Sequence, residues 1–277
     1  MVQTASVPTA HVNGIDLHYV VEGSGPRVLL FNGSGATVES AAPMLSALTP
    51  HFEVLLHDQR CLGLSTVTDA VPTMADYAAD GAALLDHLGW ESVRVFGISF
   101  GGMVAQEFAV TWPERVTRLA LMCTSPGGAG GSSFPLHTIE AMEPAEQERL
   151  RLHLMDLRYT DEFLAVNPFD RMLVDMAVAA RATPKDERTA RGERLQLQGR
   201  AGHDVWDRLP RISCPVLVAS GEFDALAPPD NGRSIASRVQ FGEFRSFVGG
   251  HGFLWQDRTA WPSVVEWLRT EGDALSR

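Results

Sequence analysis

The pentapeptide at residues 97–101, Gly-Ile-Ser-Phe-Gly, constrains the fold of this chain more than any other feature. It follows an apolar run at 93–96 and precedes helix-forming sequence at 103–108. Glycines on both sides of Ser99 suit a sharp turn from a strand into a helix, which holds the serine in a strained conformation with its hydroxyl at the end of a sheet. The pattern alone is weak, but the strand-to-helix setting makes Ser99 a candidate nucleophile.

Short, continuous apolar runs alternate with helical segments along most of the chain. Asn13-Gly14 predicts a two-residue hairpin turn into an alternating strand from Ile15 to Val21. The order predicts an α/β fold: a mostly parallel sheet with an antiparallel start and helices on both faces. The expected strands lie at 28–31, 54–56, 93–96, 119–122 and 216–219, and the expected helices at about 38–48, 74–88, 102–111 and 261–268.

One interval, from about Phe134 to Asp204, contains no strand-like run and has a helical, amphipathic pattern. A glycine-rich segment at 126–133 precedes it and suits a hinge or a loose loop. A helical insertion between two strands of an open sheet can lie over the carboxyl ends of the strands, where ligands bind in such sheets.

Composition excludes several classes of protein. The 277 residues carry a net charge of −11, which argues against a nucleic-acid partner. No run approaches the roughly 20 apolar residues that span a bilayer, and residues 1–6 lack the basic and apolar regions of a signal peptide. We therefore expect a cytoplasmic protein without a membrane partner.

The three cysteines, Cys61, Cys123 and Cys214, are widely spaced and form no metal-binding or redox motif. We expect no metal site, and we expect Cys123 and Cys214 to be buried as small apolar side chains.

A serine nucleophile needs a base, and the base needs a carboxylate to fix its tautomer. Asp224 follows the strand at 216–219, and His251 lies in a glycine-flanked turn after 244–248. Both are predicted at the same sheet edge as Ser99, in the chain order Ser, Asp, His. Two alternatives stay open. Asp224 could only cap the helix near Pro228, and Glu222 could be the acid in place of Asp224.

The other histidines are weaker candidates for the base. His57 ends an earlier strand and is expected to be packed or hydrogen-bonded there. His137 and His203 fall in or at the end of the insertion and are expected at the surface, although His203 could touch a substrate.

Negative charge that develops on a substrate oxygen is stabilised by hydrogen-bond donors that are already in place. One candidate is the backbone N–H of Phe100, and the other is the N–H of Ser34 in the Asn-Gly-Ser-Gly loop at 32–35. Asn32 and Gly33 are expected beside the substrate. The alternative is a tight turn without a catalytic role, and phosphate binding is disfavoured because the loop lacks a lysine or a G-x-G-x-x-G pattern.

These motifs, with the segment at 58–65, resemble the α/β-hydrolase family over nearly the whole chain, in particular esterase- and lactonase-like serine hydrolases. The resemblance implies a three-layer fold with an eight-stranded sheet, a core of residues 1–125 and 206–277, and a helical cap at 126–205. It also implies a Ser99–His251–Asp224 triad that needs no cofactor, and a purely structural role for Asp58, Arg60, Gly63 and Ser65.

Two positions depart from the family pattern. The loop at Asn32 more often begins His-Gly, and Cys61 stands where the family usually has glycine. The side chain of Cys61 is expected to be either exposed and open to alkylation or buried.

The function expected from these features is hydrolysis of a small or medium apolar carboxylic ester, lactone or thioester through an acyl-enzyme on Ser99. A carbon–carbon bond hydrolase is a second possibility, because residues 33–35 partly resemble the oxyanion loop of that group, but Gly252 stands where that group tends to have tryptophan. A ligand receptor or a non-hydrolytic cyclase that retains the triad is a third, because a fold does not determine a function.

Overall fold

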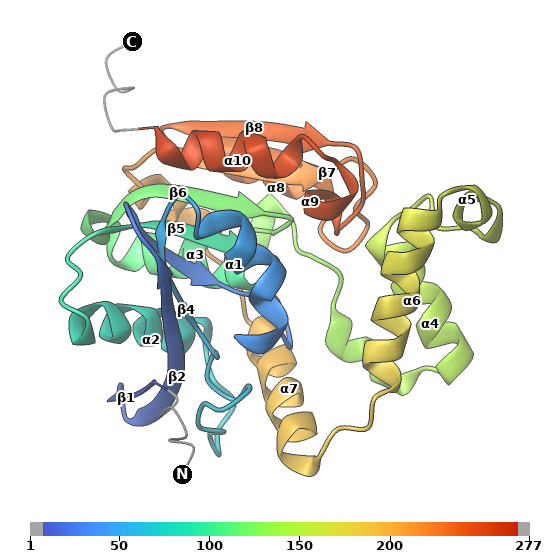
Figure 1. The fold of residues 1–277 in the computed structure, drawn as a ribbon, viewed down its shortest axis with the longest axis horizontal. Coiled ribbons are helices and arrows are strands. Elements are labelled where there is room, and N and C mark those ends of the chain that lie inside the picture. The colour runs from blue at the N-terminus through green and yellow to red at the C-terminus, as the bar shows by residue number, and fades with distance from the viewer. Residues whose placement is uncertain (1–7, 271–277) are drawn as a thin grey trace.

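The computed structural model describes residues 8–270, apart from the side chain of residue 140, so the segment judged for a signal peptide lies outside the described residues. The described residues form an eight-stranded sheet in the order β1-β2-β4-β3-β5-β6-β7-β8 (Figure 1). β1 and β2 pair antiparallel, β2 pairs antiparallel with β4, and the other pairs are parallel. The strands are β1 (Thr9–Val12), β2 (Ile15–Gly23), β3 (Arg27–Phe31), β4 (Glu53–His57), β5 (Val93–Ile98), β6 (Val116–Met122), β7 (Val216–Gly221) and β8 (Gly242–Phe247).

Helices cover both faces of this sheet, as the continuous apolar runs predict. Alternate residues of β3 enter different cores: Leu29 and Phe31 pack in one cluster, Val28 and Leu30 in the other. The first cluster includes residues of α2 (Met74–His87), α3 (Phe100–Thr111) and α8 (Pro229–Arg238), and the second includes residues of α1 (Ala42–Leu48), α9 (Phe253–Gln256) and α10 (Ala260–Arg269). The predicted three-layer α/β fold is confirmed.

Local signals place the elements accurately. Asn13 and Gly14 have φ angles of 50° and 76°, so the predicted left-handed hairpin turn joins β1 to β2. Helix α3 begins at Phe100, two residues before the expected start, because the chain turns into the helix directly after Ser99.

Between β6 and β7 the chain forms helices and loops without a strand, as expected. The α-helices are α4 (Pro144–Met155), α5 (Asp161–Val166), α6 (Pro168–Ala182) and α7 (Glu187–Arg200). Figure 1 shows α4, α5 and α6 standing away from the sheet and α7 returning toward it. No helix of residues 8–270 is long and apolar enough to cross a membrane.

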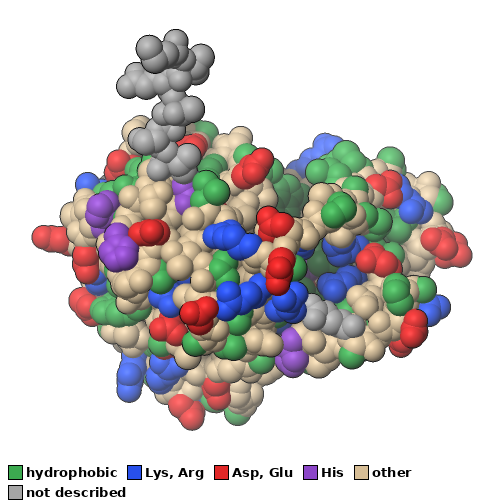
Figure 2. Space-filling view, turned by 90° about the horizontal axis from the view of Figure 1, so that it is seen from below, with side chains coloured by type: hydrophobic (Ala, Val, Ile, Leu, Met, Phe, Trp, Pro, Cys, Tyr) green, Lys and Arg blue, Asp and Glu red, His purple; other side chains and the backbone are tan. Residues whose placement is uncertain are grey.

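The surface in Figure 2 is hollowed, with lysine or arginine side chains in and beside the hollow. An open cleft of about 600 Å³ has Ser34 and Gly35 on one side and residues of α4, α6 and α7 on the other. The loop that was predicted to hold the substrate oxygen therefore borders a cleft that faces the helical insertion.

All three cysteines are buried, which confirms the expectation for Cys123 and Cys214. It also settles the two alternatives for Cys61, which has no exposed side-chain surface and lies beside Thr68, with Sγ 3.3 Å from its hydroxyl oxygen.

Candidate active site

Ser99 occupies the turn between β5 and α3 in a strained backbone conformation, with φ 55° and ψ −117°. The backbone around it is fixed by hydrogen bonds: its N–H donates to the carbonyl oxygen of Met122 at 2.8 Å, and its own carbonyl oxygen accepts from Thr124 Oγ1 at 2.9 Å. A Cβ at Gly97 would lie 2.5 Å from the carbonyl oxygen of Gly101, so glycine is required where the turn closes.

The structure brings Ser99, His251 and Asp224 together. Ser99 Oγ lies 2.9 Å from Nε2 of His251, and Nδ1 of the same ring lies 2.8 Å from Oδ2 of Asp224. An ionised carboxylate only accepts hydrogen bonds, so Nδ1 carries the proton and the neutral ring accepts the serine hydroxyl at Nε2. This tautomer is the one in which a histidine can remove a proton from serine.

Asp224 is held by the loop that follows β7. Its Oδ1 accepts the backbone N–H groups of Leu226 at 2.9 Å and Ala227 at 2.8 Å, which leaves Oδ2 for His251. It does not cap α8, which begins at Pro229 without a side-chain cap. Glu222 is exposed, and its side chain makes no bond to His251 among those the structure describes.

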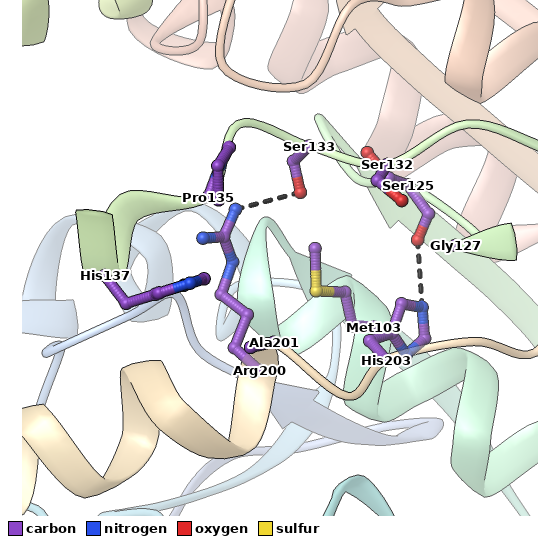
Figure 3. A pocket seen from close by; sticks show the side chains of 10 residues that line it. All are labelled: Met103, Ser125, Gly127, Ser132, Ser133, Pro135, His137, Arg200, Ala201 and His203. Atoms are coloured by element: carbon purple, nitrogen blue, oxygen red, sulfur yellow. Dashed lines mark hydrogen bonds between the residues drawn. The ribbon is translucent and has the colours of Figure 1, made fainter. Parts of the chain in front are cut away.

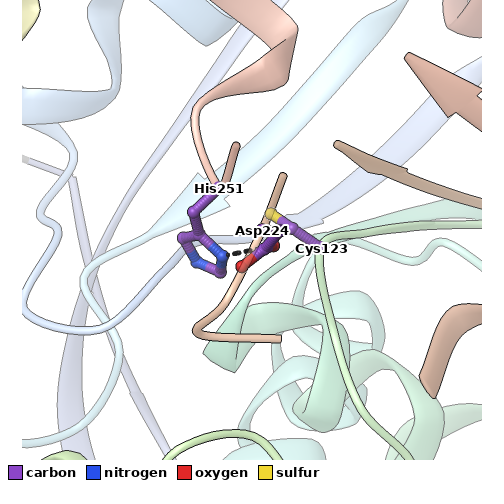
Figure 4. Close-up of side chains that lie close together, drawn as sticks. All are labelled: Cys123, Asp224 and His251. Atoms are coloured by element: carbon purple, nitrogen blue, oxygen red, sulfur yellow. Dashed lines mark hydrogen bonds and ion pairs between the residues drawn. The ribbon is translucent and has the colours of Figure 1, made fainter. Parts of the chain in front are cut away.

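Cys123 lies against the Asp224–His251 pair, as Figure 4 shows. One ligand atom of each of the three residues lies within 4.8 Å of those of the other two, a spacing that a metal ion could bridge. Both ring nitrogens of His251 are already engaged, however, by Asp224 and Ser99. The group therefore offers a metal no free imidazole lone pair in this arrangement.

Two opposing effects set the pKa of His251. Burial lowers it, because burial disfavours the charged ring, while the Asp224 carboxylate raises it, with a further contribution from neighbouring Cys123. The pKa lies above its usual value, because the carboxylate contact favours the imidazolium.

The loop at 32–35 lies beside Ser99: a Cβ at Gly33 would be 3.9 Å from Cβ of Ser99. Asn32 is buried, and its Oδ1 accepts the N–H of Gly33 at 2.9 Å, so this side chain holds its own loop. Within the described part of the chain, the N–H groups of Phe100 and Ser34 donate to no protein acceptor. Phe100 is the first residue of α3, where N–H groups have no partner in the helix.

The end of α4 is bonded to both loops that carry the acid and the histidine. The N–H of His251 donates to the carbonyl oxygen of Met155 at 2.6 Å, and the N–H of Leu226 donates to that of Leu154 at 2.9 Å. The insertion thus helps to position these loops, a contact that the sequence pattern does not reveal.

The expectation that His203 lies at the surface is wrong. Its side chain is buried, and Nε2 lies 3.0 Å from the carbonyl oxygen of Ser125 (Figure 3). Burial lowers the pKa of His203 to about 4, and it does the same for His57, which is packed edge-on against Phe31 as expected. His137 is exposed.

The fold defines the class of this protein: the chain belongs to the alpha/beta hydrolase fold family, whose model matches residues 26–257. It is 27% identical over 258 residues to a poly(3-hydroxyalkanoate) depolymerase from Ectopseudomonas oleovorans, covering 88% of this chain and 84% of that protein. The family model and the similarity to the depolymerase both place the chain among the hydrolases.

Solved structures agree in fold. An enol-lactonase from Burkholderia xenovorans superposes with a TM-score of 0.78 at 24% identity, covering 95% of this chain and 100% of that chain. A thermophilic esterase from Thermogutta terrifontis gives a TM-score of 0.74 at 25% identity, covering 95% of this chain and 97% of that chain.

Proposed function

We propose that this protein is a serine hydrolase that cleaves small or medium carboxylic esters through an acyl-enzyme on Ser99. The observation that carries the proposal is the continuous hydrogen-bonded path from Ser99 Oγ through His251 to Asp224, with distances of 2.9 Å and 2.8 Å. Nucleophile, base and orienting carboxylate are in reach of one another without movement of the chain.

In acylation, Ser99 Oγ attacks the ester carbonyl carbon while Nε2 of His251 takes the hydroxyl proton. Asp224 holds the ring through Nδ1–H and stabilises the imidazolium. The oxyanion accepts hydrogen bonds from the N–H groups of Phe100 and Ser34, each contributing about 10²- to 10³-fold in rate. His251 then gives its proton to the departing alkoxide, which leaves as the alcohol.

In deacylation, His251 removes a proton from a water molecule, which attacks the acyl carbon on Ser99. Collapse of the second tetrahedral intermediate releases the carboxylic acid and returns the proton to Ser99 Oγ. These steps use only protein groups and water, so the proposed reaction needs no cofactor.

We further propose that residues 126–205 act as a helical cap on a core of residues 1–125 and 206–277. A cavity of about 180 Å³ supports this view, because residues of α4, α6 and α9 line it. Its lining includes Gly252, the residue after His251, and the side chains of Leu152, Val174 and Trp255. An apolar acyl chain fits this lining, while Asn32 and Gly33 shape the backbone around the ester group.

Three of the similar proteins have names that support bond cleavage at an acyl carbon: a poly(3-hydroxyalkanoate) depolymerase, an enol-lactonase and an esterase. Esters and lactones share the carbonyl chemistry proposed for Ser99, and thioesters react in the same way, so all three belong in the substrate panel.

The test is turnover of p-nitrophenyl acetate, butyrate and octanoate by wild type and by Ser99→Ala, together with labelling by a fluorophosphonate probe. We expect wild-type turnover, labelling of Ser99 alone, and loss of both in the variant. Folding of Ser99→Ala is checked by its melting temperature. A wild-type protein that is neither labelled nor active on any acyl ester, lactone or thioester overturns the proposal.

A further inference from the structure

Arg200, the last residue of α7, is a buried cation without a counter-ion among the described side chains. It is 7% exposed, and its described bond is from Nη2 to the hydroxyl oxygen of Ser133 at 2.9 Å. Arg60 and Arg118 are buried to a similar extent. Arg60 forms two bonds of 2.6 Å to the carboxylate of Asp80, and the guanidinium of Arg118, which also lacks an acidic partner among the described side chains, lies over the ring of Trp267 at 4.2 Å from its centre. An unpaired buried charge is costly, and a guanidinium has five N–H donors to satisfy.

Arg200 lines a cavity of about 120 Å³, several times the space that one water molecule needs. Figure 3 shows its side chain reaching from the end of α7 toward the segment that carries Ser133. Ser125, Ser132 and Ser133 also belong to the lining of the cavity. Ser133 Oγ accepts the bond from Arg200, and the buried Ser125 Oγ accepts one from Asn231 Nδ2 at 2.8 Å, so each hydroxyl keeps its hydrogen.

The charge of Arg200 favours an anion in this cavity. His203 lies in its wall, but burial lowers the pKa of this histidine to about 4, so its ring is neutral at pH 7. Burial lowers the pKa of Arg200 only to about 10, so the guanidinium stays charged. Of the ten residues in the lining, Arg200 is the one lysine or arginine. A single planar guanidinium matches a carboxylate, which it can bind through two parallel hydrogen bonds.

One residue of the cavity wall is close to the proposed nucleophile along α3. Met103 in its wall follows Ser99 by four residues, about one helical turn of α3. On α7, Gln196 lies one turn before Arg200, and its Oε1 accepts the N–H of Gly35 at 2.8 Å. The helix that carries Arg200 is thus tethered to the loop that carries Ser34.

We propose that Arg200 binds a carboxylate of the substrate, so that the enzyme prefers esters or lactones that carry a second, ionised carboxyl group. The inference names the substrate class of the proposed hydrolase and rests on that function for its kinetic test. The binding test below is independent of turnover.

The kinetic test compares kcat/KM for 5-acetoxypentanoate and pentyl acetate, which have the same alcohol chain length and differ in the terminal carboxylate. The carboxylate then lies on the alcohol side of the ester, so the acyl chain stays free for the cavity between α4, α6 and α9. Homologous pairs from 3-acetoxypropanoate to 6-acetoxyhexanoate are included. We expect wild type to favour the charged ester at least tenfold at one chain length, Arg200→Met to bring the ratio close to one, and Arg200→Lys to retain part of it. The exposed Arg211→Met is the matched control and keeps the wild-type ratio.

The binding test uses Ser99→Ala, which cannot form the acyl-enzyme, and 5-acetoxypentanoate in a calorimetric titration. We expect binding that weakens at least tenfold when Arg200→Met is added, with a melting temperature that shows an intact fold. Turnover of neutral esters without a charge preference at any length, and equal binding with and without Arg200, overturn this inference and leave the hydrolase standing. If the protein binds the charged ester through Arg200 but hydrolyses no ester, the carboxylate site stands and the hydrolase proposal is overturned.

Discussion

Gly101 lies directly against the end of β3: a Cβ on this residue would be 2.0 Å from the carbonyl oxygen of Phe31. The first turn of α3 therefore packs on the backbone of the strand that leads into the loop at 32–35. This contact places two N–H groups, those of Phe100 and Ser34, on neighbouring segments beside Ser99. The second glycine of the pentapeptide is thus required by the close approach of two backbone segments.

We expect Gly101→Ala to abolish ester turnover and to destabilise the fold by about 1–3 kcal/mol, because the added methyl group forces the helix and the strand apart. The measurements are kcat/KM on p-nitrophenyl butyrate and the free energy of unfolding in urea. Gly202→Ala is the control, since the nearest atom to its Cβ would be 3.7 Å away. Wild-type activity in Gly101→Ala would show that the close packing is not needed.

The pH dependence of the rate follows from His251. The base must be neutral, and the net pKa of this histidine is raised by Asp224 against the lowering effect of burial. Activity is therefore lost as the pH falls through that pKa, and we expect kcat/KM to rise with pH with a midpoint above 6.5. In Asp224→Asn the midpoint moves down and the rate falls about 10⁴-fold. The rate of fluorophosphonate labelling, measured across pH, gives the midpoint for the wild type and for Asp224→Asn. A wild-type midpoint at or below 6.5 contradicts the prediction.

Much of the fold could be predicted because its signals are local. The Asn13-Gly14 turn, the apolar strands and the glycines around Ser99 each act within a few residues, so their effect is visible in the sequence. The common location of Ser99, Asp224 and His251 could also be predicted. Each of them follows a strand, and the carboxyl ends of parallel strands meet at one edge of the sheet.

The features that could not be predicted depend on contacts between distant segments. His203 is expected at the surface because it lies at the end of the insertion, yet its Nε2 lies 3.0 Å from the carbonyl oxygen of Ser125 in the folded chain. The sequence predicts burial of Cys123, but it does not predict that this residue, directly after β6, lies against Asp224 and His251. Arg200 stands out because no acidic side chain among the described residues pairs with it, and the sequence alone cannot show which charges are paired in the fold.

Stability at acid pH follows from the buried histidines. The folded-state pKa values of His57 and His203 are lowered by burial to about 4, below the unfolded value of 6.5. The unfolded chain therefore binds protons first, and stability present above pH 6.5 is lost as the pH falls toward 4, by roughly 2 kcal/mol per histidine at pH 5. We expect His203→Gln to show a smaller drop in melting temperature between pH 7.5 and pH 5 than wild type. The exposed His51→Gln is the control, and an equal drop in all three proteins would refute the effect.

Chain-length preference tests the apolar cavity between α4, α6 and α9. Ala177 on α6 lines this cavity, and a larger side chain there would occupy the space proposed for the acyl chain. Each methylene excluded from an apolar pocket costs about 1 kcal/mol or more, so we expect Ala177→Phe to lower kcat/KM for p-nitrophenyl octanoate relative to the acetate by about tenfold or more. Ala179→Phe adds the same side chain at an exposed position of the same helix and should keep the wild-type ratio. If the two variants show the same ratio, the acyl chain lies elsewhere, and the open cleft beside Ser34 becomes the site to mutate next.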